Sequence, residues 1–350
     1  MILATLLLAW VLTWAMRRFA LSRNLLDIPN ARSSHQVATP RGGGAAIVLA
    51  FSALVVLCFA LGLTSAKIAA ALLLGGAVVA IAGFMDDRSP LSPRVRLLAH
   101  ASAGLLAVLL LGAVPGLPLP GGFWAWGWFG VPLSLVGVIW CINLYNFMDG
   151  IDGLAAVEAV CLALGAQLAL FAIGADVSPL LLGWAAAALG YLYWNWPPAK
   201  IFMGDVGSGW LGFLIAAFLL LTGPAGLNAW VWLILFAVFL VDANWTLMVR
   251  WRRGEKLSDA HRNHSYQKAS RLAGGHRPVT ITVVLINVFW LWPLAAAAAL
   301  YPAQGLWLAL LAMLPLLWLA MHYRGGVPDT VSAQSKPASP RAHSSSPEKS

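Results

Sequence analysis

Residues 128–153 read WFGVPLSLVGVIWCINLYNFMDGIDG, a long apolar run that ends in a polar cluster. The run is long enough for a membrane-spanning helix, which needs about 20 apolar residues. Polar side chains begin inside it and recur every three positions, at Asn143, Asn146, Asp149 and Asp152. On a continuing helix this spacing predicts one polar ridge that leaves the membrane. Oxygen-rich side chains of this kind suit hydrogen bonding to a base or sugar and support of Mg²⁺.

Composition extends this pattern to the whole chain. Hydrophobic residues make up 60% of the 350 positions and charged residues only 10%, whereas soluble domains are about one quarter charged. We therefore expect an all-α, polytopic membrane protein. Its membrane domain is predicted over 1–324. The segment 325–350 is rich in Ser, Pro, Ala and Lys and predicts a disordered tail.

Apolar runs of sufficient length occur throughout the membrane domain. We expect about eleven transmembrane helices, at roughly 1–16, 44–64, 68–85, 97–114, 128–146, 154–174, 179–194, 209–223, 228–249, 279–300 and 304–322.

Charge predicts the orientation of these helices. With a periplasmic N-terminus and a cytoplasmic C-terminus, 21 of the 22 Lys and Arg residues lie on the cytoplasmic side, and Lys67 is the exception. Positive charge concentrates on that side of bacterial membrane proteins. The net charge of +9 is explained in this way, so we expect no nucleic-acid partner.

Two further acidic clusters lie at helix ends on the same predicted side. Asp86 and Asp87 directly follow an apolar run, and adjacent carboxylates favour a bound cation or a shared proton. Asp205 lies in the glycine-rich stretch FMGDVGSG, residues 202–209, just before another apolar run. A metal that bridges Asp205 to a phosphate would suit this position, and an N-cap role for Asp205 is the alternative.

The most basic loop carries the sequence HRNH at 261–264. His261, Arg262 and His264 suit the binding of a diphosphate, and ordinary positive-inside charge is the alternative. Asp242 is a buried-looking acid near a helix end, as is Glu158. The stretch TPRGGG at 39–44 predicts a loop whose glycines approach a ligand closely, or a plain turn.

Taken in this order, the clusters resemble the polyprenyl-phosphate N-acetylhexosamine-1-phosphate transferases (glycosyltransferase family 4). The resemblance covers Asp27 to about Gln267, and its most specific motifs are NxxNxxDGxDG from Asn143 and FxGDxGS from Phe202. The sequence HRNHSYQ at 261–267 departs from the HxHH of many members. It resembles the subgroup that initiates O-antigen synthesis with N-acetylated 6-deoxyhexosamines.

The resemblance implies a role for each cluster. Asp86 and Asp87 would act near the lipid phosphate. His261 and His264 would act near the diphosphate, and Asp205 would bind Mg²⁺, with Mn²⁺ as the alternative metal. Substrate contacts would come from Asn143, Asn146, Asp149, Asp152, Phe202, Asp242 and Arg262, with Phe202 stacking on uracil.

The expected function is transfer of a sugar-1-phosphate from a UDP-N-acetylhexosamine to undecaprenyl phosphate, with release of UMP. The donor sugar would be a 6-deoxy sugar such as FucNAc or QuiNAc, or alternatively GlcNAc. The enzyme would lie in a bacterial inner membrane, among membrane lipids, with its site on the cytoplasmic face, as a monomer or a homodimer. A secondary transporter is the alternative from another class, although its ionisable groups would be expected near the bilayer midplane.

Overall fold

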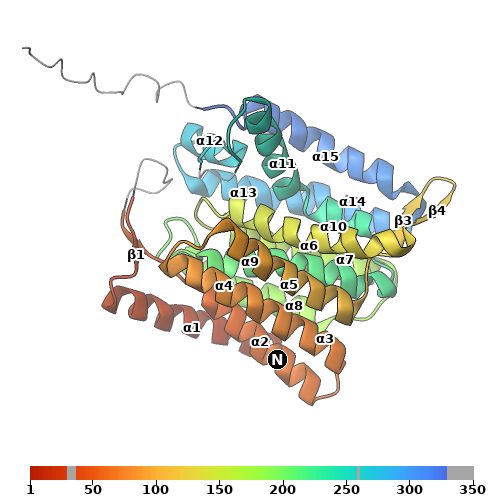
Figure 1. Cartoon of the computed structure of the whole chain (residues 1–350), viewed down its shortest axis with the longest axis horizontal. Coiled ribbons are helices and arrows are strands. Elements are labelled where there is room, and N and C mark those ends of the chain that lie inside the picture. Colours follow the sequence, from red (N-terminus) through yellow and green to blue (C-terminus); the bar gives the residue numbers. More distant parts are fainter. Residues whose placement is uncertain (30–36, 258–260, 329–350) are drawn as a thin grey trace, which may run out of the picture.

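The computed structural model describes residues 1–29, 37–257 and 261–328 as a bundle of helices that run side by side (Figure 1). The longer helices are α1 (Ile2–Ser22), α2 (Gly44–Ala60), α4 (Gly76–Arg88), α5 (Pro93–Leu111), α6 (Gly130–Phe147), α7 (Leu154–Ala172), α8 (Pro179–Asn195), α9 (Asp205–Thr222), α11 (Ala237–Arg252) and α15 (Gly305–His322). The shorter ones are α3 (Ala66–Ala70), α10 (Ala229–Leu235), α12 (Ser265–Leu272), α13 (His276–Ile286) and α14 (Trp292–Leu300). Single π-helical turns over Ala71–Gly75 and Asn287–Leu291 join α3 to α4 and α13 to α14, and 3₁₀ turns cover Gly127–Phe129, Gly223–Ala225 and Pro302–Gln304.

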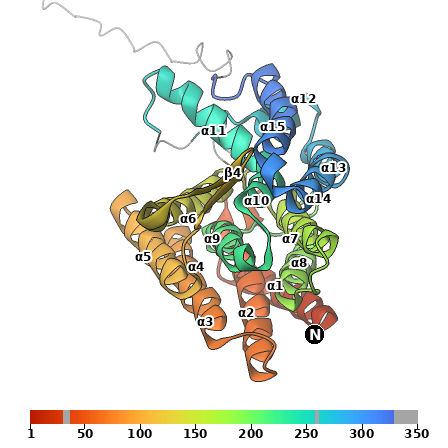
Figure 2. The ribbon, with the colours of Figure 1, turned by 90° about the vertical axis from the view of Figure 1, so that its right-hand side faces the viewer.

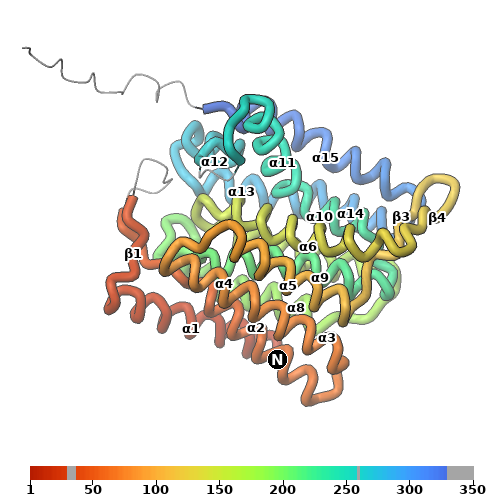
Figure 3. Tube along the Cα trace, viewed as in Figure 1, coloured from red at the N-terminus to blue at the C-terminus, as the bar shows by residue number. Residues whose placement is uncertain are grey.

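Two short antiparallel strand pairs lie at opposite ends of the bundle. β1 (Leu26–Asp27) pairs with β2 (Thr39–Pro40), and β3 (Gly116–Leu119) pairs with β4 (Gly122–Ala125). In Figure 1, β1 and α12 lie at the left end and the β3–β4 pair lies at the right end. In Figure 3 the chain passes from α3 on the right into α4, which ends on the left.

Helix α9 lies at the centre of the bundle. Viewed along the helices, α2, α4, α6, α7 and α8 surround it (Figure 2), and its residues from Val206 to Phe218 are all buried. Small residues permit this packing: a Cβ atom added to Gly44 would lie 2.3 Å from Cα of Gly207, so the two backbones touch. Such contacts between small residues are typical of helix packing in membranes.

The expectation of a mostly helical membrane protein is confirmed. Within the described residues, eight helices are long and apolar enough to cross a membrane, or nine if the bent pair α10–α11 forms one span. Each of the eleven predicted segments overlaps a helix. However, α2 and α8 have only 17 residues each, so eleven crossings stay a prediction.

The segment 228–249, predicted as one span, is instead divided. α10 and α11 meet at Phe236 with a bend of 76°. The bend surrounds a buried tyrosine of α6: the ring of Tyr145 lies 6.2 Å from that of Phe236 and 5.0 Å from that of Phe239. Aromatic packing of this kind depends on a neighbouring helix, so hydropathy along 228–249 could not reveal it.

The ordered chain continues past the predicted tail boundary. Gly325 and Gly326, assigned to the tail from composition, are buried and hydrogen-bonded. Composition over 325–350 predicted a disordered tail, whereas the missing side chains of these two glycines allow close packing. The rest of the predicted tail, residues 329–350, lies outside the described residues.

A polar pair joins α7 to the π-helical turn before α14. Nδ2 of Asn287 donates to Oε2 of Glu158 at 2.9 Å, and both side chains are fully buried. Oε1 of Glu158 and Oδ1 of Asn287 have no hydrogen-bond partner among the described residues. A proton on Glu158 would satisfy both acceptors at once, because the carboxylic acid could then donate to the amide oxygen.

This pairing predicts that Glu158→Gln preserves thermal stability, since a glutamine amide carries the same donor and acceptor as a protonated acid. Glu158→Ala should destabilise the fold by about 1–3 kcal/mol, because the buried Asn287 amide loses one of its two hydrogen bonds and keeps only that to the Val283 carbonyl. Thermal unfolding in detergent measures both. Equal losses in the two variants would contradict a neutral acid–amide pair.

Candidate functional site

The entrance to α9 is built from two loops far apart in sequence. N–H groups of Gly43 and Gly44 donate to the carbonyls of Phe202 and Met203, both at 2.9 Å, and the Phe202 N–H donates to Pro40 at 2.8 Å. In the stretch predicted to approach a ligand or form a turn, Gly43 and Gly44 therefore bind the loop that precedes Asp205. Phe202 is held through its backbone.

Asp87 caps α9 from the end of α4. Its carboxylate accepts the N–H groups of Asp205 at 3.1 Å and Val206 at 3.2 Å. Gly204 is the N-cap residue, with φ of +75°, and Asp205 lies in the first turn without capping it. The N-cap alternative for Asp205 is thus wrong, and Asp87, predicted as catalytic, holds the helix that carries Asp205.

The Asp205 carboxylate lies close to Asp86 and to the Asn146 amide. These three side chains and Asn143 line a small cavity of about 40 Å³ between α4, α5, α6 and α9. Nδ2 of Asn146 also donates to Oγ of Ser208 at 3.2 Å. Three of the four predicted clusters therefore meet in this cavity, which we call the carboxylate cavity.

Two residues of α5 that the sequence did not single out line the same cavity, Arg96 and His100. Nη1 of Arg96 lies 3.5 Å from Oδ2 of Asp86, and Nδ1 of His100 lies 3.4 Å from Nδ2 of Asn143. The sequence did contain a pattern that could have identified them, because they are four residues apart in a largely apolar span and so share one helix face. Ionisable residues in such spans are functional candidates by default.

The predicted polar ridge ends earlier than expected. α6 ends at Phe147, so Asn143 and Asn146 lie on the helix while Asp149 and Asp152 lie in the following loop. Burial raises the pKa of Asp149 well above its ordinary value, and the negative charges of Asp205 and Asp87 raise it further. The carboxylates are therefore crowded enough to repel one another, which a cation would relieve.

Asp152 ties two other segments together. Its Oδ2 accepts the N–H of Ala199 at 3.0 Å, and Oδ1 lies 3.2 Å from Nδ1 of His276 at the start of α13. The carbonyl of Asp152 also accepts a hydrogen bond from Thr280 at 2.9 Å. Both carboxylate oxygens thus contact protein groups, whereas the resemblance implied a contact to substrate.

Asp242 orients His264 at the start of α12. Its carboxylate accepts the N–H groups of Ser265 at 3.0 Å and Tyr266 at 2.8 Å, and Oδ1 lies 3.2 Å from Nδ1 of His264. His264 is only 2% exposed, and its Nε2 has no hydrogen-bond partner among the described residues. Asp242 therefore contacts this histidine rather than standing free for a substrate.

His261 and Arg262 flank this arrangement. The His261 ring stacks on that of His264 with centroids 4.9 Å apart, and its Nδ1 lies 2.7 Å from Nη1 of Arg250. Arg250 is buried and also pairs with Glu255 at 2.9 Å. The carbonyl of Arg262 accepts hydrogen bonds from Arg271, so this residue is placed through its backbone.

The segment 261–264, which we call the histidine loop, meets the carboxylate cavity at the end of α6. The hydroxyl of Tyr266 donates to the carbonyl of Phe147 at 3.1 Å, and the rings of Phe147 and His264 lie 6.4 Å apart. Phe147 also lines the carboxylate cavity. All four predicted clusters are therefore joined into one continuous site.

The oxygen-rich donor set fits a hard divalent cation. Among the described residues, no three His, Cys, Asp or Glu side chains form a group able to hold a metal alone. Mg²⁺ usually binds through one or two carboxylates together with waters and substrate phosphates. Asp205 and Asp86, with the Asn146 amide beside them, suit such a substrate-completed site.

The capping contact predicts that loss of the Asp87 carboxylate destabilises the fold. Asp87→Ala should lower the free energy of unfolding by about 1–2 kcal/mol, because two amides at the start of α9 lose their acceptor. Asp176→Ala, at an exposed loop aspartate, is the matched control and should change little. Chemical unfolding in detergent measures the difference, and equal stability of the two variants would contradict the cap.

Part of this chain matches a known protein family, and most of it is similar to known proteins. A family model described as glycosyl transferase family 4 matches residues 69–223, which include Asp86, Asn146 and Asp205. A Bacillus subtilis protein described as "Probable undecaprenyl-phosphate N-acetylglucosaminyl 1-phosphate transferase" is 26% identical, over 96% of this chain and 93% of its own.

Two other relatives carry similar descriptions. A decaprenyl-phosphate N-acetylglucosaminephosphotransferase of Mycobacterium tuberculosis is 28% identical over 84% of this chain and 80% of its own. An undecaprenyl-phosphate alpha-N-acetylglucosaminyl 1-phosphate transferase of Escherichia coli is 28% identical over 77% of this chain and 75% of its own. Residues 69–223 are thus similar to glycosyl transferase family 4, and most of the chain is similar to polyprenyl-phosphate N-acetylglucosamine-1-phosphate transferases.

Proposed function

We propose that this membrane protein transfers a sugar-1-phosphate from a UDP-N-acetylhexosamine to undecaprenyl phosphate and releases UMP. The observation that carries the proposal is the meeting of Asp86, Asn146 and Asp205 in one cavity, joined to His264 through Phe147. These residues come from α4, α6, α9 and the loop before α12. The names of the relatives support the same reaction class.

In the proposed reaction, an oxygen of the lipid phosphate bonds to the sugar-bearing phosphorus of the donor. The bond from that phosphorus to the bridging oxygen breaks, and UMP leaves with the bond's electron pair. Asp86, which lines the carboxylate cavity beside Arg96, would position the lipid phosphate and accept its proton. Phosphoryl transfer depends mainly on such positioning and on charge stabilisation.

Positive and polar groups would offset the charge of the two anionic substrates. In its doubly protonated form, His264 would donate from Nε2 to a diphosphate oxygen while Nδ1 donates to Asp242, which fixes the orientation of the ring. His261 and Arg262 would lie on the same side of the diphosphate. A Mg²⁺ ion, or Mn²⁺ in its place, would be held by Asp205 and would neutralise charge on the diphosphate.

The donor sugar has two candidates. GlcNAc is supported by the names of the three relatives described above. An N-acetylated 6-deoxyhexosamine, such as FucNAc or QuiNAc, is supported by the HRNHSYQ sequence at 261–267. With the first donor the enzyme would initiate a cell-envelope polysaccharide through a GlcNAc lipid, and with the second it would initiate O-antigen synthesis.

We place the site at the cytoplasmic face of a bacterial inner membrane. Support comes from the concentration of Lys and Arg in the segments next to the clusters, which favours a periplasmic N-terminus and a cytoplasmic C-terminus. The eleven crossings predicted from the sequence agree with this orientation, because an odd number of crossings puts the two termini on opposite sides of the membrane.

Direct transfer tests the proposal. Membranes containing the protein should convert undecaprenyl phosphate and a labelled UDP-sugar into a labelled lipid with one equivalent of UMP. A panel of UDP-GlcNAc, UDP-FucNAc and UDP-QuiNAc should give a preferred donor. Labelled sugar that crosses the membrane without lipid product would support the transporter alternative instead.

A charge-removing substitution tests the role of Asp205. Asp205→Asn should keep the melting temperature within a few degrees of wild type, because Asp87 caps the helix. Turnover should fall at least hundredfold across a Mg²⁺ titration if two or more charged contacts are lost, at about 1.5–3 kcal/mol each. A wild-type rate with unchanged Mg²⁺ dependence would assign the metal to another carboxylate.

A further inference from the structure

The chain reverses direction directly after α15. The N–H of Arg324 donates to Met321 at 2.9 Å, and the N–H of Gly325 donates to Ala320 at 3.0 Å. This pair of bonds is a Schellman motif, in which the chain turns away from the helix axis. Arg324 has φ of +54°, in the left-handed region that glycine usually occupies at this point. Contacts made by the next few residues therefore hold the turn.

These residues, Arg324–Val327, lie against the histidine loop, and we call them the clasp. The N–H of Gly326 donates to the carbonyl of Asn263 at 2.8 Å. Nζ of Lys268, on α12, donates to the carbonyls of Arg324 and Val327. Lys268 is only 9% exposed, and these carbonyls help to solvate its buried ammonium.

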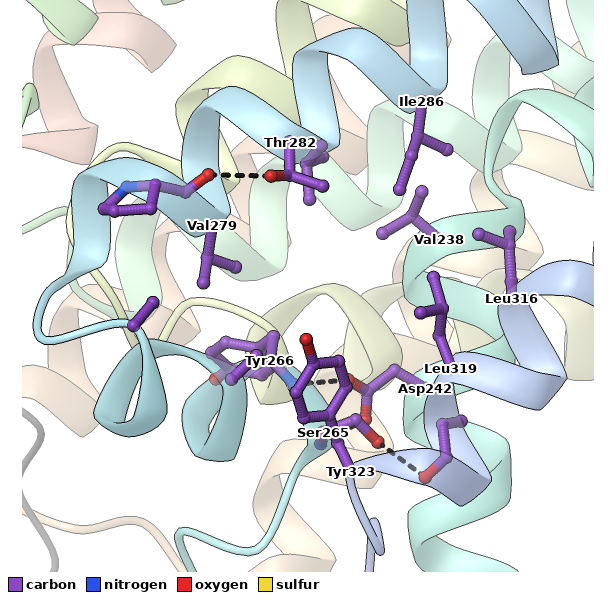
Figure 4. A pocket seen from close by; sticks show the side chains of 15 residues that line it. Val238, Asp242, Ser265, Tyr266, Val279, Thr282, Ile286, Leu316, Leu319 and Tyr323 are labelled. Atoms are coloured by element: carbon purple, nitrogen blue, oxygen red, sulfur yellow. Dashed lines mark hydrogen bonds between the residues drawn. The ribbon is translucent and has the colours of Figure 1, made fainter.

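Packing of the clasp is tight. A Cβ atom added to Gly325 would lie 2.4 Å from Oγ of Ser265, and one added to Gly326 would lie 2.7 Å from the carbonyl of Thr246 on α11. Ser265 in turn donates from Oγ to the carbonyl of Ala320 at 3.3 Å (Figure 4). The clasp thus contacts the residues on both sides of His264 in sequence, Asn263 and Ser265.

Another side of α12 is less firmly packed. A cavity of about 200 Å³ lies between α11, α12, α13 and α15 (Figure 4). It is lined largely by apolar side chains, among them Val279, Ile286 and Leu316, and it reaches Asp242 and Tyr266. A helix that borders such a space is held by its hydrogen bonds. For the start of α12 these run to Asp242, to the carbonyls of Phe147 and Ala320, and to the clasp.

We propose that Lys268 and the clasp are positioning elements that set the place of the His264 imidazole in the transferase site. The inference rests on the proposed function and assigns a task to chain residues after the last span. The clasp fixes Asn263 and Ser265, and Asp242 then fixes the ring between them. A displacement of about 1 Å in a catalytic group can lower turnover by roughly a hundredfold.

Substitution of Lys268 tests this role. Lys268→Met should lower kcat at least tenfold, with KM for the UDP-sugar within twofold of wild type. Lys268→Arg should recover at least half of the lost rate on a logarithmic scale, because arginine can still donate to two carbonyls. Wild-type kcat in Lys268→Met would overturn the proposal.

A matched pair of truncations tests the clasp itself. A chain that ends after Pro328 keeps the clasp and should turn over like wild type. A chain that ends after Tyr323 removes it and should lose at least tenfold in kcat. Equal rates for the two truncations would overturn the proposal.

Coupling to His264 separates positioning from general destabilisation. In a His264→Ala background, Lys268→Met should cause less than a twofold further loss, since the ring that it positions is gone. A full tenfold further loss would show that Lys268 acts elsewhere and would overturn the assignment.

Hydrogen exchange tests, independently of activity, whether the clasp holds the histidine loop in place. Lys268→Met should increase exchange in the peptide that spans 261–268, while peptides of α9 stay protected. Unchanged protection of 261–268 would overturn the proposal. An inactive wild-type protein would refute the proposed function alone, because the exchange result still decides whether the clasp holds this loop.

Discussion

The arrangement of the site depends on the contact between the Asp87 carboxylate and the first amides of α9. An α-helix leaves its first N–H groups without intrahelical partners, and its N-terminus carries partial positive charge. Asp87 satisfies the N–H groups of Asp205 and Val206 from a different helix. This contact holds the ends of α4 and α9 together although Asp86 and Asp205 would repel each other there. The carboxylate cavity exists because this attraction opposes that repulsion.

Acidic residues at this end of the bundle divide into two groups. Asp87, Asp152 and Asp242 each accept backbone N–H groups from a distant segment and so fix the start of α9, the loop at 197–200 and the start of α12. Asp86 and Asp205 line the carboxylate cavity, and Asp149 lies close enough to share their charge repulsion. The tying acids are tertiary counterparts of helix caps. The other three are the carboxylates of the proposed chemistry, although Asp86 also accepts the nearby N–H of Leu91.

Sequence predicted the helices and the clusters, because apolar run length and the position of polar residues are local properties. It predicted the meeting of the clusters only through charge bias, which assigns loops to one side. It could not tell the acids that accept backbone N–H groups of distant segments from the acids that line the cavity, since Asp87 caps a helix that begins 118 residues later. The bend at Phe236 was not predicted for the same reason, because Tyr145, which packs against Phe236, belongs to another helix. Arg96 and His100 did carry a local signal, an ionisable pair four residues apart in a largely apolar span.

The central position of α9 also orders the biosynthesis of the protein. Its neighbours α2, α4, α6, α7 and α8 are all made before it, and during that time Asp87 has not yet met the amides that it caps. The central helix of the bundle is therefore missing until about residue 222 has been made. Insertion of α9 then completes the contact with Asp87 and the carboxylate cavity together. A nascent chain stopped before this point would contain most of the acids of the site without the helix that arranges them.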